Sequence, residues 1–248
     1  MARQRNLRNP PIVEAVVDIV TRYAEPGNPE RFGTLQSDIE TTYPTREVRQ
    51  GFKFTIAADQ GRPVTSGAPL PGGYVFRNTD NTWVVQSKIG GFSFSQLAPY
   101  RDWDTAVAEA MRVWETYRAR FKPDRVLRLS VRFINRLKFP GPSLDFDNYI
   151  VRTPTIPPDL PQAFSGFSVA YVINEVAPHT VARVQMGFSA TECTPTEVPV
   201  LLDIDILREC DIDPANLASI MGSLAELRVL KNNVFFGTLT EQAVKVFE

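Results

Sequence analysis

The residues that could do chemistry in this chain are few and widely spaced. His179 is the only histidine, and it follows Pro178 in a stretch that is typical of a turn between two strands. A Ser-His-Asp or Cys-His arrangement would need this histidine, but the serines and cysteines lie outside any recognisable nucleophile motif. The phosphate-binding loop and the dinucleotide-binding glycine pattern are also absent from the sequence. The sequence therefore disfavours nucleophilic catalysis, and no cofactor is expected.

Two carboxylates, Asp203 and Asp205, are spaced to lie on one face of a predicted strand. Paired carboxylates can hold Mg²⁺, which would fit a magnesium-dependent hydrolase. The alternative is a solvated or salt-bridged strand face, which the same alternation predicts and which we favour.

Three arginines, Arg128, Arg132 and Arg136, fall on the polar side of the stretch 125–140. Apolar residues alternate with them there, and this alternation predicts a half-buried strand. An arginine stripe along a sheet can hold phosphates, so nucleic-acid binding is one hypothesis. The chain as a whole is nearly neutral, with 27 basic and 28 acidic residues, and this argues against a general attraction to nucleic acid.

Asn135 breaks the alternation, because it falls on the apolar face of that strand. A buried amide needs hydrogen-bond partners, so Asn135 is expected to fix something local. The residues predicted to bind a ligand or a partner are Arg132, Asn135, Arg136 and Glu14.

Along the chain, the apolar periodicity and the turn residues predict alternating strands and helices. The expected strands are 12–23, 47–57, 74–76, 83–97 with a bend at its paired glycines, 125–140, 167–176, 181–190 and 198–209. The expected helices are 29–43, a long one capped by Asp102, a second long one that begins near Asp213, and a short one at the end of the chain. Two segments are irregular. Residues 58–73 are predicted to be a functional or mobile loop, and the proline-rich segment 140–165 is predicted to be an extended connector.

The order of these elements repeats, which predicts an α+β fold with internal duplication in two units, 1–124 and 125–248, or one continuous domain. Strands linked by hairpins and followed by helices predict a curved antiparallel sheet with the long helices on one face. The arrangement resembles the saddle of TATA-binding-protein-like folds, and a helix-grip fold is the alternative. We expect Trp103, Trp114, Leu224 and Leu227 to be buried where the helices meet the sheet. Ile220 and Met221 are expected to share the buried face of the second long helix.

The first strands of the two halves are expected to pair antiparallel, in a register in which paired residue numbers sum to about 150. The expected pairs are Glu14 with Arg136, Asp18 with Arg132, Val16 with Ile134 and Asn135 with Ala15. These pairs would make two of the stripe arginines structural and weaken the nucleic-acid hypothesis.

The composition is that of a globular protein, with 43% hydrophobic and 22% charged residues. The sequence has no apolar signal region and no long apolar run, and its two cysteines, Cys193 and Cys210, have no zinc-type spacing. We therefore expect a cytoplasmic protein that is not embedded in a membrane.

Four stretches of the chain resemble a known family. They are NPPIVEAV (9–16), GGFSFSQLAPYRDW (90–103), RFINR (132–136) and FFGTLTEQA (235–243). In this order they are similar to a sporadically distributed family of uncharacterised bacterial proteins. The resemblance implies no established activity, cofactor or catalytic residue, and the patchy distribution would fit an accessory role in defence or toxin control.

Together these observations favour a non-enzymatic binding protein that holds a protein partner or a small ligand in the concavity of its sheet. Nucleic-acid binding through the arginine stripe and magnesium-dependent hydrolysis at Asp203 and Asp205 are the alternatives.

Overall fold

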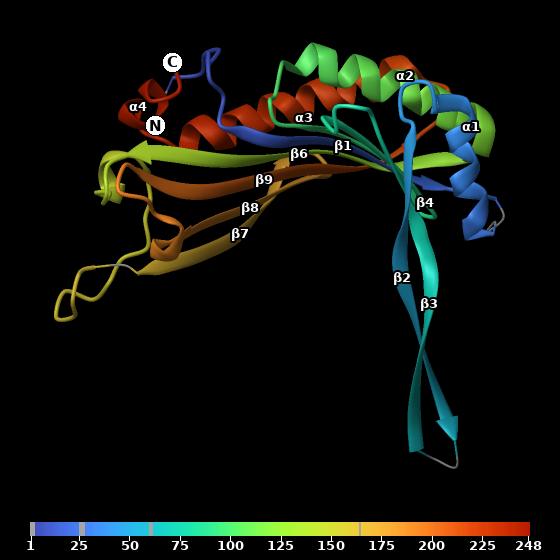
Figure 1. Ribbon diagram of the computed structural model, residues 1–248, viewed down its shortest axis with the longest axis horizontal. Helices are drawn as coiled ribbons and strands as arrows, with labels where there is room; N and C mark the ends of the chain where they lie inside the picture. The colour runs from blue at the N-terminus through green and yellow to red at the C-terminus, as the bar shows by residue number, and fades with distance from the viewer. Residues whose placement is uncertain (1–2, 25–27, 60–61, 164) are drawn as a thin grey trace.

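The computed structural model describes residues 3–24, 28–59, 62–163 and 165–248. It has a nine-stranded antiparallel sheet in the order β2-β3-β4-β5-β1-β6-β9-β8-β7, with two long helices on one face (Figure 1). The strands are β1 (Ile12–Arg22), β2 (Thr45–Asp59), β3 (Arg62–Arg77), β4 (Trp83–Lys88), β5 (Gly91–Leu97), β6 (Arg125–Pro140), β7 (Gly166–Ala177), β8 (Thr180–Ser189) and β9 (Glu197–Ile212). The helices are α1 (Gln36–Ile39), α2 (Trp103–Phe121), α3 (Leu217–Thr238) and α4 (Glu241–Lys245), with 3-10 turns at Pro29–Leu35, Phe146–Asn148 and Ala190–Glu192. The expected α+β fold with a large antiparallel sheet is confirmed.

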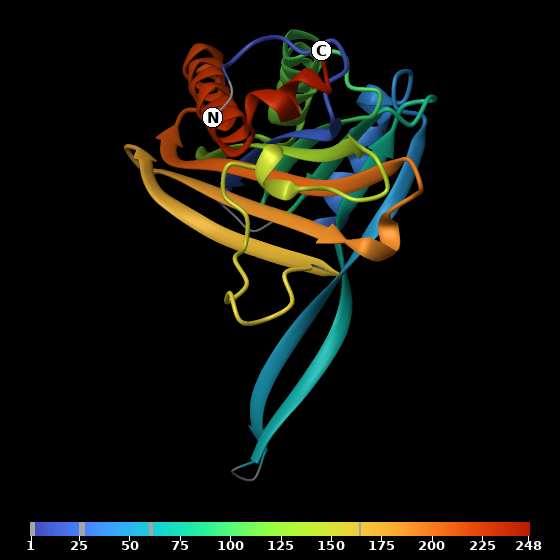
Figure 2. The same cartoon turned by 90° about the vertical axis from the view of Figure 1, so that its left-hand side faces the viewer.

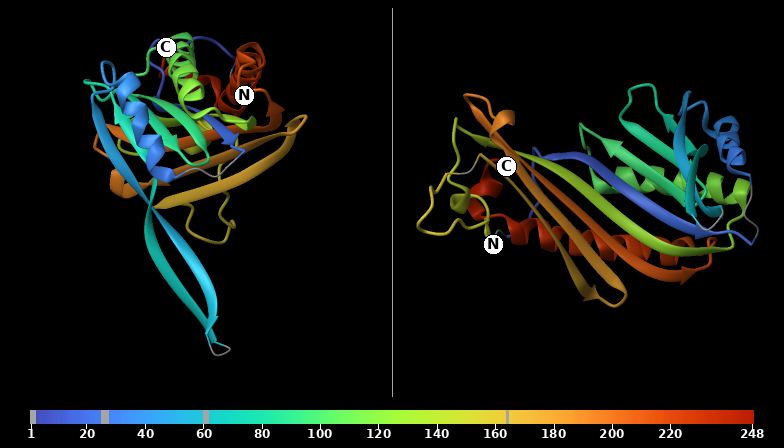
Figure 3. Two further views of the ribbon diagram at one scale, coloured as in Figure 1. Left: turned by 90° about the vertical axis from the view of Figure 1, so that its right-hand side faces the viewer. Right: turned by 90° about the horizontal axis from the view of Figure 1, so that it is seen from below.

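The sheet runs without a break through both halves of the chain, because β1 pairs with β6 at its centre. Seen from below, the strands lie in front of the long helices, so one face of the sheet is covered and the other is open (Figure 3). The view in Figure 2 shows α2 and α3 side by side on the covered face. We call the two sides of the sheet the covered face and the open face.

The core lies between the covered face and the two long helices. Leu129, Val131 and Phe133 of β6 point into it, as their alternation predicts, and Trp114 and Leu224 close it from the helices. Trp103 is also buried, as expected. Met221 is an error of prediction: it is exposed, because the buried side of α3 runs through Ile220, Leu224 and Leu227.

The central pairing was predicted correctly, but its register is shifted by two residues. The paired numbers sum to 148 along most of the contact, so Glu14 lies opposite Ile134, Val16 opposite Arg132 and Asp18 opposite Ser130. The expected pairs of Glu14 with Arg136, Asp18 with Arg132 and Asn135 with Ala15 are therefore wrong. A shift of two residues keeps every side chain on its own face, so the face pattern alone did not reveal the error.

The expected helix 29–43 is a 3-10 turn at Pro29–Leu35 followed by the short α1. Two segments of the sheet also differ from their predicted form. Residues 62–73, expected in a loop, belong to β3, which pairs along its length with β2 in a hairpin that extends below the sheet (Figure 1). Residues 60–61 of the expected loop lie outside the described residues. The expected bend at Gly90 and Gly91 is a hairpin turn instead, since β4 pairs antiparallel with β5. Glycine is required at 91, because a Cβ atom there would lie 2.1 Å from the Ile19 carbonyl oxygen.

In the part of the chain that the structure describes, none of the helices is long and apolar enough to cross a membrane.

Candidate functional site

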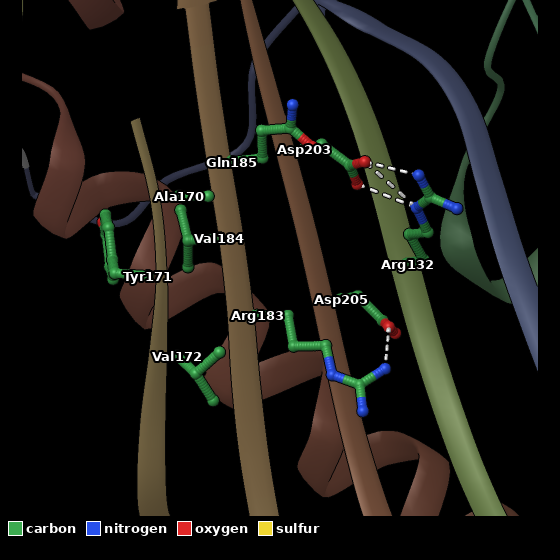
Figure 4. Close-up of a pocket in the computed structure, with 9 residues that line it drawn as sticks. All are labelled: Arg132, Ala170, Tyr171, Val172, Arg183, Val184, Gln185, Asp203 and Asp205. Atoms are coloured by element: carbon green, nitrogen blue, oxygen red, sulfur yellow. Dashed lines mark hydrogen bonds and ion pairs between the residues drawn. The ribbon is translucent and has the colours of Figure 1, made fainter. Parts of the chain in front are cut away.

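The open face carries a cavity of about 350 Å³ over β6, β9, β8 and β7 (Figure 4). Two ion pairs cross the strands here. The Arg132 guanidinium donates to the Asp203 carboxylate, with 2.9 Å between Nε and Oδ1, and Arg183 lies 4.0 Å from the nearest oxygen of Asp205. These charges come from neighbouring strands that present alternate residues to the same face, so each pair joins two strands.

The rest of the arginine stripe is also paired. Arg128 lies 3.5 Å from Asp18, which Lys88 also contacts at 2.6 Å. Arg136 lies 3.0 Å from Glu192, which precedes β9 in the chain. The stripe therefore has carboxylate partners, as expected, but both predicted pairs, Glu14 with Arg136 and Asp18 with Arg132, were wrong because the register is shifted.

The two aspartates of β9 both lie beside arginines. Burial raises the pKa of Asp205 above its ordinary value, against the opposing effect of Arg132 and other nearby arginines. Asp203 is held by Arg132. Among the described residues, no group of three or more His, Cys, Asp or Glu side chains is placed to hold a metal ion.

The structure separates the four predicted site residues. Glu14, Arg132 and Arg136 lie on the open face, where Arg136 pairs with Glu192. Asn135 lies on the covered face, where it is 1% exposed and its amide donates to the carbonyl oxygens of Phe133 and Leu202. His179 is exposed in the turn between β7 and β8, away from both groups.

Asn135 belongs to a second cavity, of about 360 Å³, on the covered face. We call it the helix cavity. Its lining comes from segments far apart in the sequence: the N-terminal segment, the start of α2, the end of β6 and the second half of α3. The lining residues include Pro10, Pro11, Tyr100, Arg101, Trp103, Phe133, Asn135, Arg228, Lys231 and Phe235.

The N-terminal segment closes one side of the helix cavity and is tied to the end of the chain. Arg5 contacts Glu241 and Glu248, and the Asn9 amide donates to the Phe247 carbonyl oxygen at 3.0 Å. The Arg136 amide donates to the carbonyl oxygen of Pro11 at 2.8 Å, which fixes this segment against β6. The cavity wall is thus a packed part of the fold.

Lys231 is the buried cation of the helix cavity. It is 7% exposed, and its ammonium nitrogen lies 4.0 Å from the centre of the Phe133 ring and 5.8 Å from that of Phe235. Across the described residues it has neither a hydrogen bond nor an ion pair. Burial, aided by the charge of Arg228, lowers the pKa of Lys231 from 10.5 to about 7.

Sequence reasoning missed this lysine, although a signal was present. The buried stripe of α3 runs through Ile220, Leu224, Leu227 and Phe235, and Lys231 occupies the position in that stripe where an apolar residue is expected. A lysine at such a position is almost never fully buried unless it is paired. The helical period alone would have identified it.

Comparison with models of protein families, with curated proteins and with solved structures found no match.

Proposed function

We propose that this chain is a non-enzymatic binding protein that holds a small ligand in the helix cavity. The observation that carries the proposal is Lys231, a buried cation that faces a cavity without a protein partner. Burying a charge without a partner costs free energy, and a leucine or methionine would fill this position of α3 without that cost. A ligand that interacts with the ammonium group gives a reason for the lysine.

The cavity has the properties of a small-molecule site. Its size is within the range of ligand pockets, and its walls combine aromatic rings with a few polar groups. The four stretches that resemble the bacterial family each contribute to it, through Pro10, Tyr100, Asn135 and Phe235 among others. This revises the expected location of the ligand from the concavity of the sheet to the side that the helices cover.

The alternatives have less support. Nucleic-acid binding relied on Arg128, Arg132 and Arg136, and each of these already has a carboxylate nearby. Magnesium-dependent hydrolysis relied on Asp203 and Asp205, whose contacts are with arginines. A protein partner on the open face has no observation of comparable weight behind it.

We also propose that the two halves arose by duplication and form a saddle like that of TATA-binding-protein-like folds. The strands on either side of the β1–β6 pair support this, because they run in descending chain order on both sides: β5-β4-β3-β2 beside β1 and β9-β8-β7 beside β6. The first half has one strand more than the second. Membership of the sporadic bacterial family, with an accessory role in defence or toxin control, stays a prediction from the four stretches.

A blocked variant tests whether the helix cavity is the site. Asn232 lines the cavity, so Asn232→Trp is expected to fill it, and Glu115→Trp on the exposed side of α2 is the matched control. A library of small acids, bases and neutral compounds would be screened by ligand-observed NMR. We expect compounds that bind wild type and the control but not the blocked variant. If no compound distinguishes wild type from Asn232→Trp, the helix cavity is not a ligand site.

A further inference from the structure

The helix cavity has two cations on one wall. Lys231 and Arg228 are three residues apart on α3, so they lie on neighbouring positions of one helix face. Arg228 lies with its guanidinium carbon 5.7 Å from the centre of the Trp103 ring. As with Lys231, no hydrogen bond or ion pair links Arg228 to the described part of the protein. Both cations are held against aromatic rings instead of carboxylates.

The acidic groups near this wall are engaged elsewhere or exposed. Asp102 caps α2, accepting from the backbone amide of Thr105 at 2.7 Å and from its hydroxyl at 2.8 Å. Asp104 lines the cavity but is exposed. Arg5 and Arg101 add further positive charge to the lining, although Arg5 is paired with Glu241 and Glu248. The wall at Lys231 and Arg228 therefore favours a negative charge.

The remaining walls favour an apolar body. Phe133, Phe235 and Trp103 are buried aromatic residues that line the same cavity. An aromatic surface beside two cations suits a molecule with a charged head and a hydrocarbon or aromatic body.

We propose that the ligand of the helix cavity is a small organic anion with one acidic head group and an apolar body, whose head group binds Lys231 and Arg228. This inference rests on the proposed function, because it names the chemical class that the same cavity takes. A carboxylate and a phosphate share the required chemistry.

Binding should be coupled to protonation of Lys231. An anion near the ammonium group favours its charged form, so the complex takes up a proton above the pKa of free Lys231, about 7. The other charged groups that line the cavity are Arg5, Arg101, Arg228, Asp102 and Asp104. Tyr100 stays neutral, because burial raises its pKa. The affinity for the anion should therefore fall as the pH rises through 7.

Octanoate, octyl phosphate and 1-octanol test the proposal as a matched set. The three probes share a chain and differ in the head group, and binding would be measured by titration calorimetry with the full chain. We expect octanoate or octyl phosphate to bind at least about tenfold more tightly than 1-octanol, the size of one charge-assisted interaction. Comparing the affinity for octanoate with that for octyl phosphate identifies the preferred head group.

Two variants localise the effect. Lys231→Met keeps the length of the side chain and is expected to weaken binding of the anion about tenfold or more, with little change for 1-octanol. Lys138→Met makes the same chemical change on another element, where Lys138 pairs with Glu197, and should leave all three affinities unchanged. In wild type, affinity for the anion should drop by about tenfold or more between pH 6 and pH 9, and this drop should be absent in Lys231→Met.

The outcomes separate the two proposals. If 1-octanol binds as tightly as the acids and Asn232→Trp blocks it, the cavity is a ligand site but the anion proposal is wrong. If the acids bind equally well to wild type and to Lys231→Met, or if their affinity does not depend on pH, the proposal that Lys231 binds the head group is wrong. If none of the three probes binds, the assignment to an anion with an apolar body fails, and the fragment screen alone then decides whether the cavity binds ligands.

Discussion

On the open face of the sheet the arginines lie beside carboxylates from other segments, whereas on the covered face Lys231 lies beside aromatic rings. The side chain of Arg132 is 48% exposed and that of Arg183 is 57% exposed, so water helps to solvate their charges. Lys231 is 7% exposed, and its charge lies close to the rings of Phe133 and Phe235. The many charges on the open face are paired and exposed to water, so the packing of neighbouring strands in the sheet accounts for them. A buried charge that faces a cavity and has no partner among the described residues needs another explanation, and we take that explanation to be a bound ligand.

The largest expected effect concerns the covered face. Trp114 is completely buried between Phe92 and Tyr117, with ring centres 6.0 Å and 5.6 Å away. Trp114→Ala should lower the free energy of unfolding by roughly 3–5 kcal/mol, because it removes a large buried side chain and leaves a cavity. Denaturant unfolding measures this, and Trp114→Phe is the control that keeps an aromatic ring. A loss below about 1 kcal/mol for the alanine variant would contradict the packing of α2 on the sheet.

An effect of intermediate size is expected from the titration of Lys231, which distinguishes this residue from the apolar residues of the covered face. Below pH 7 its amine is protonated in both states, so the full cost of burying the charge is present. Between pH 7 and about 10.5 the unfolded chain binds more protons than the native protein at this site, so the stability should rise with pH.

Lys231→Met should remove this rise and be more stable than wild type near pH 6, by roughly 1–3 kcal/mol, with the difference shrinking towards pH 10. The comparison between the two proteins cancels groups that titrate in both, such as Cys210, whose pKa is raised by burial to about 11. Parallel stability profiles for wild type and variant would mean that Lys231 is already paired or solvated.

The smallest effect is expected on the open face. A double-mutant cycle with Arg132→Gln and Asp203→Asn measures the coupling between these side chains. Because Arg132 is about half exposed, the coupling should be only about 0.2–1 kcal/mol and should weaken in high salt. A coupling of several kcal/mol that is insensitive to salt would mean that this pair is as dry as the covered face, and the contrast between the faces would not hold.

Much of this architecture follows from the sequence alone. The alternation in 125–140 determined which side of β6 meets the core, since side chains in a strand point to opposite faces in turn. The apolar period of the long helices and the cap at Asp102 predicted α2, where the Asp102 carboxylate does accept from the Thr105 amide. These are local properties, because each depends on neighbours along the chain.

Other features depended on contacts that the sequence does not encode locally. The face pattern repeats every two residues, so it allowed both the predicted register and the observed one, and the packing of the whole sheet chose between them. Residues 62–73 have a composition typical of loops, yet backbone pairing with β2 makes them a strand. Composition reports local preference, and hydrogen bonds to a distant strand can override it.

The helix cavity shows the same division most clearly. The strand alternation predicted Asn135 on the apolar side of β6, and the helical period aligns Lys231 with the apolar stripe of α3, although sequence reasoning did not use that signal. Only the tertiary structure brought them to one cavity, together with Pro10, Tyr100 and Arg228. The physical reason is that burial and the lack of a partner are properties of the assembled surroundings, so the low pKa of Lys231 exists only after four distant segments have packed around it.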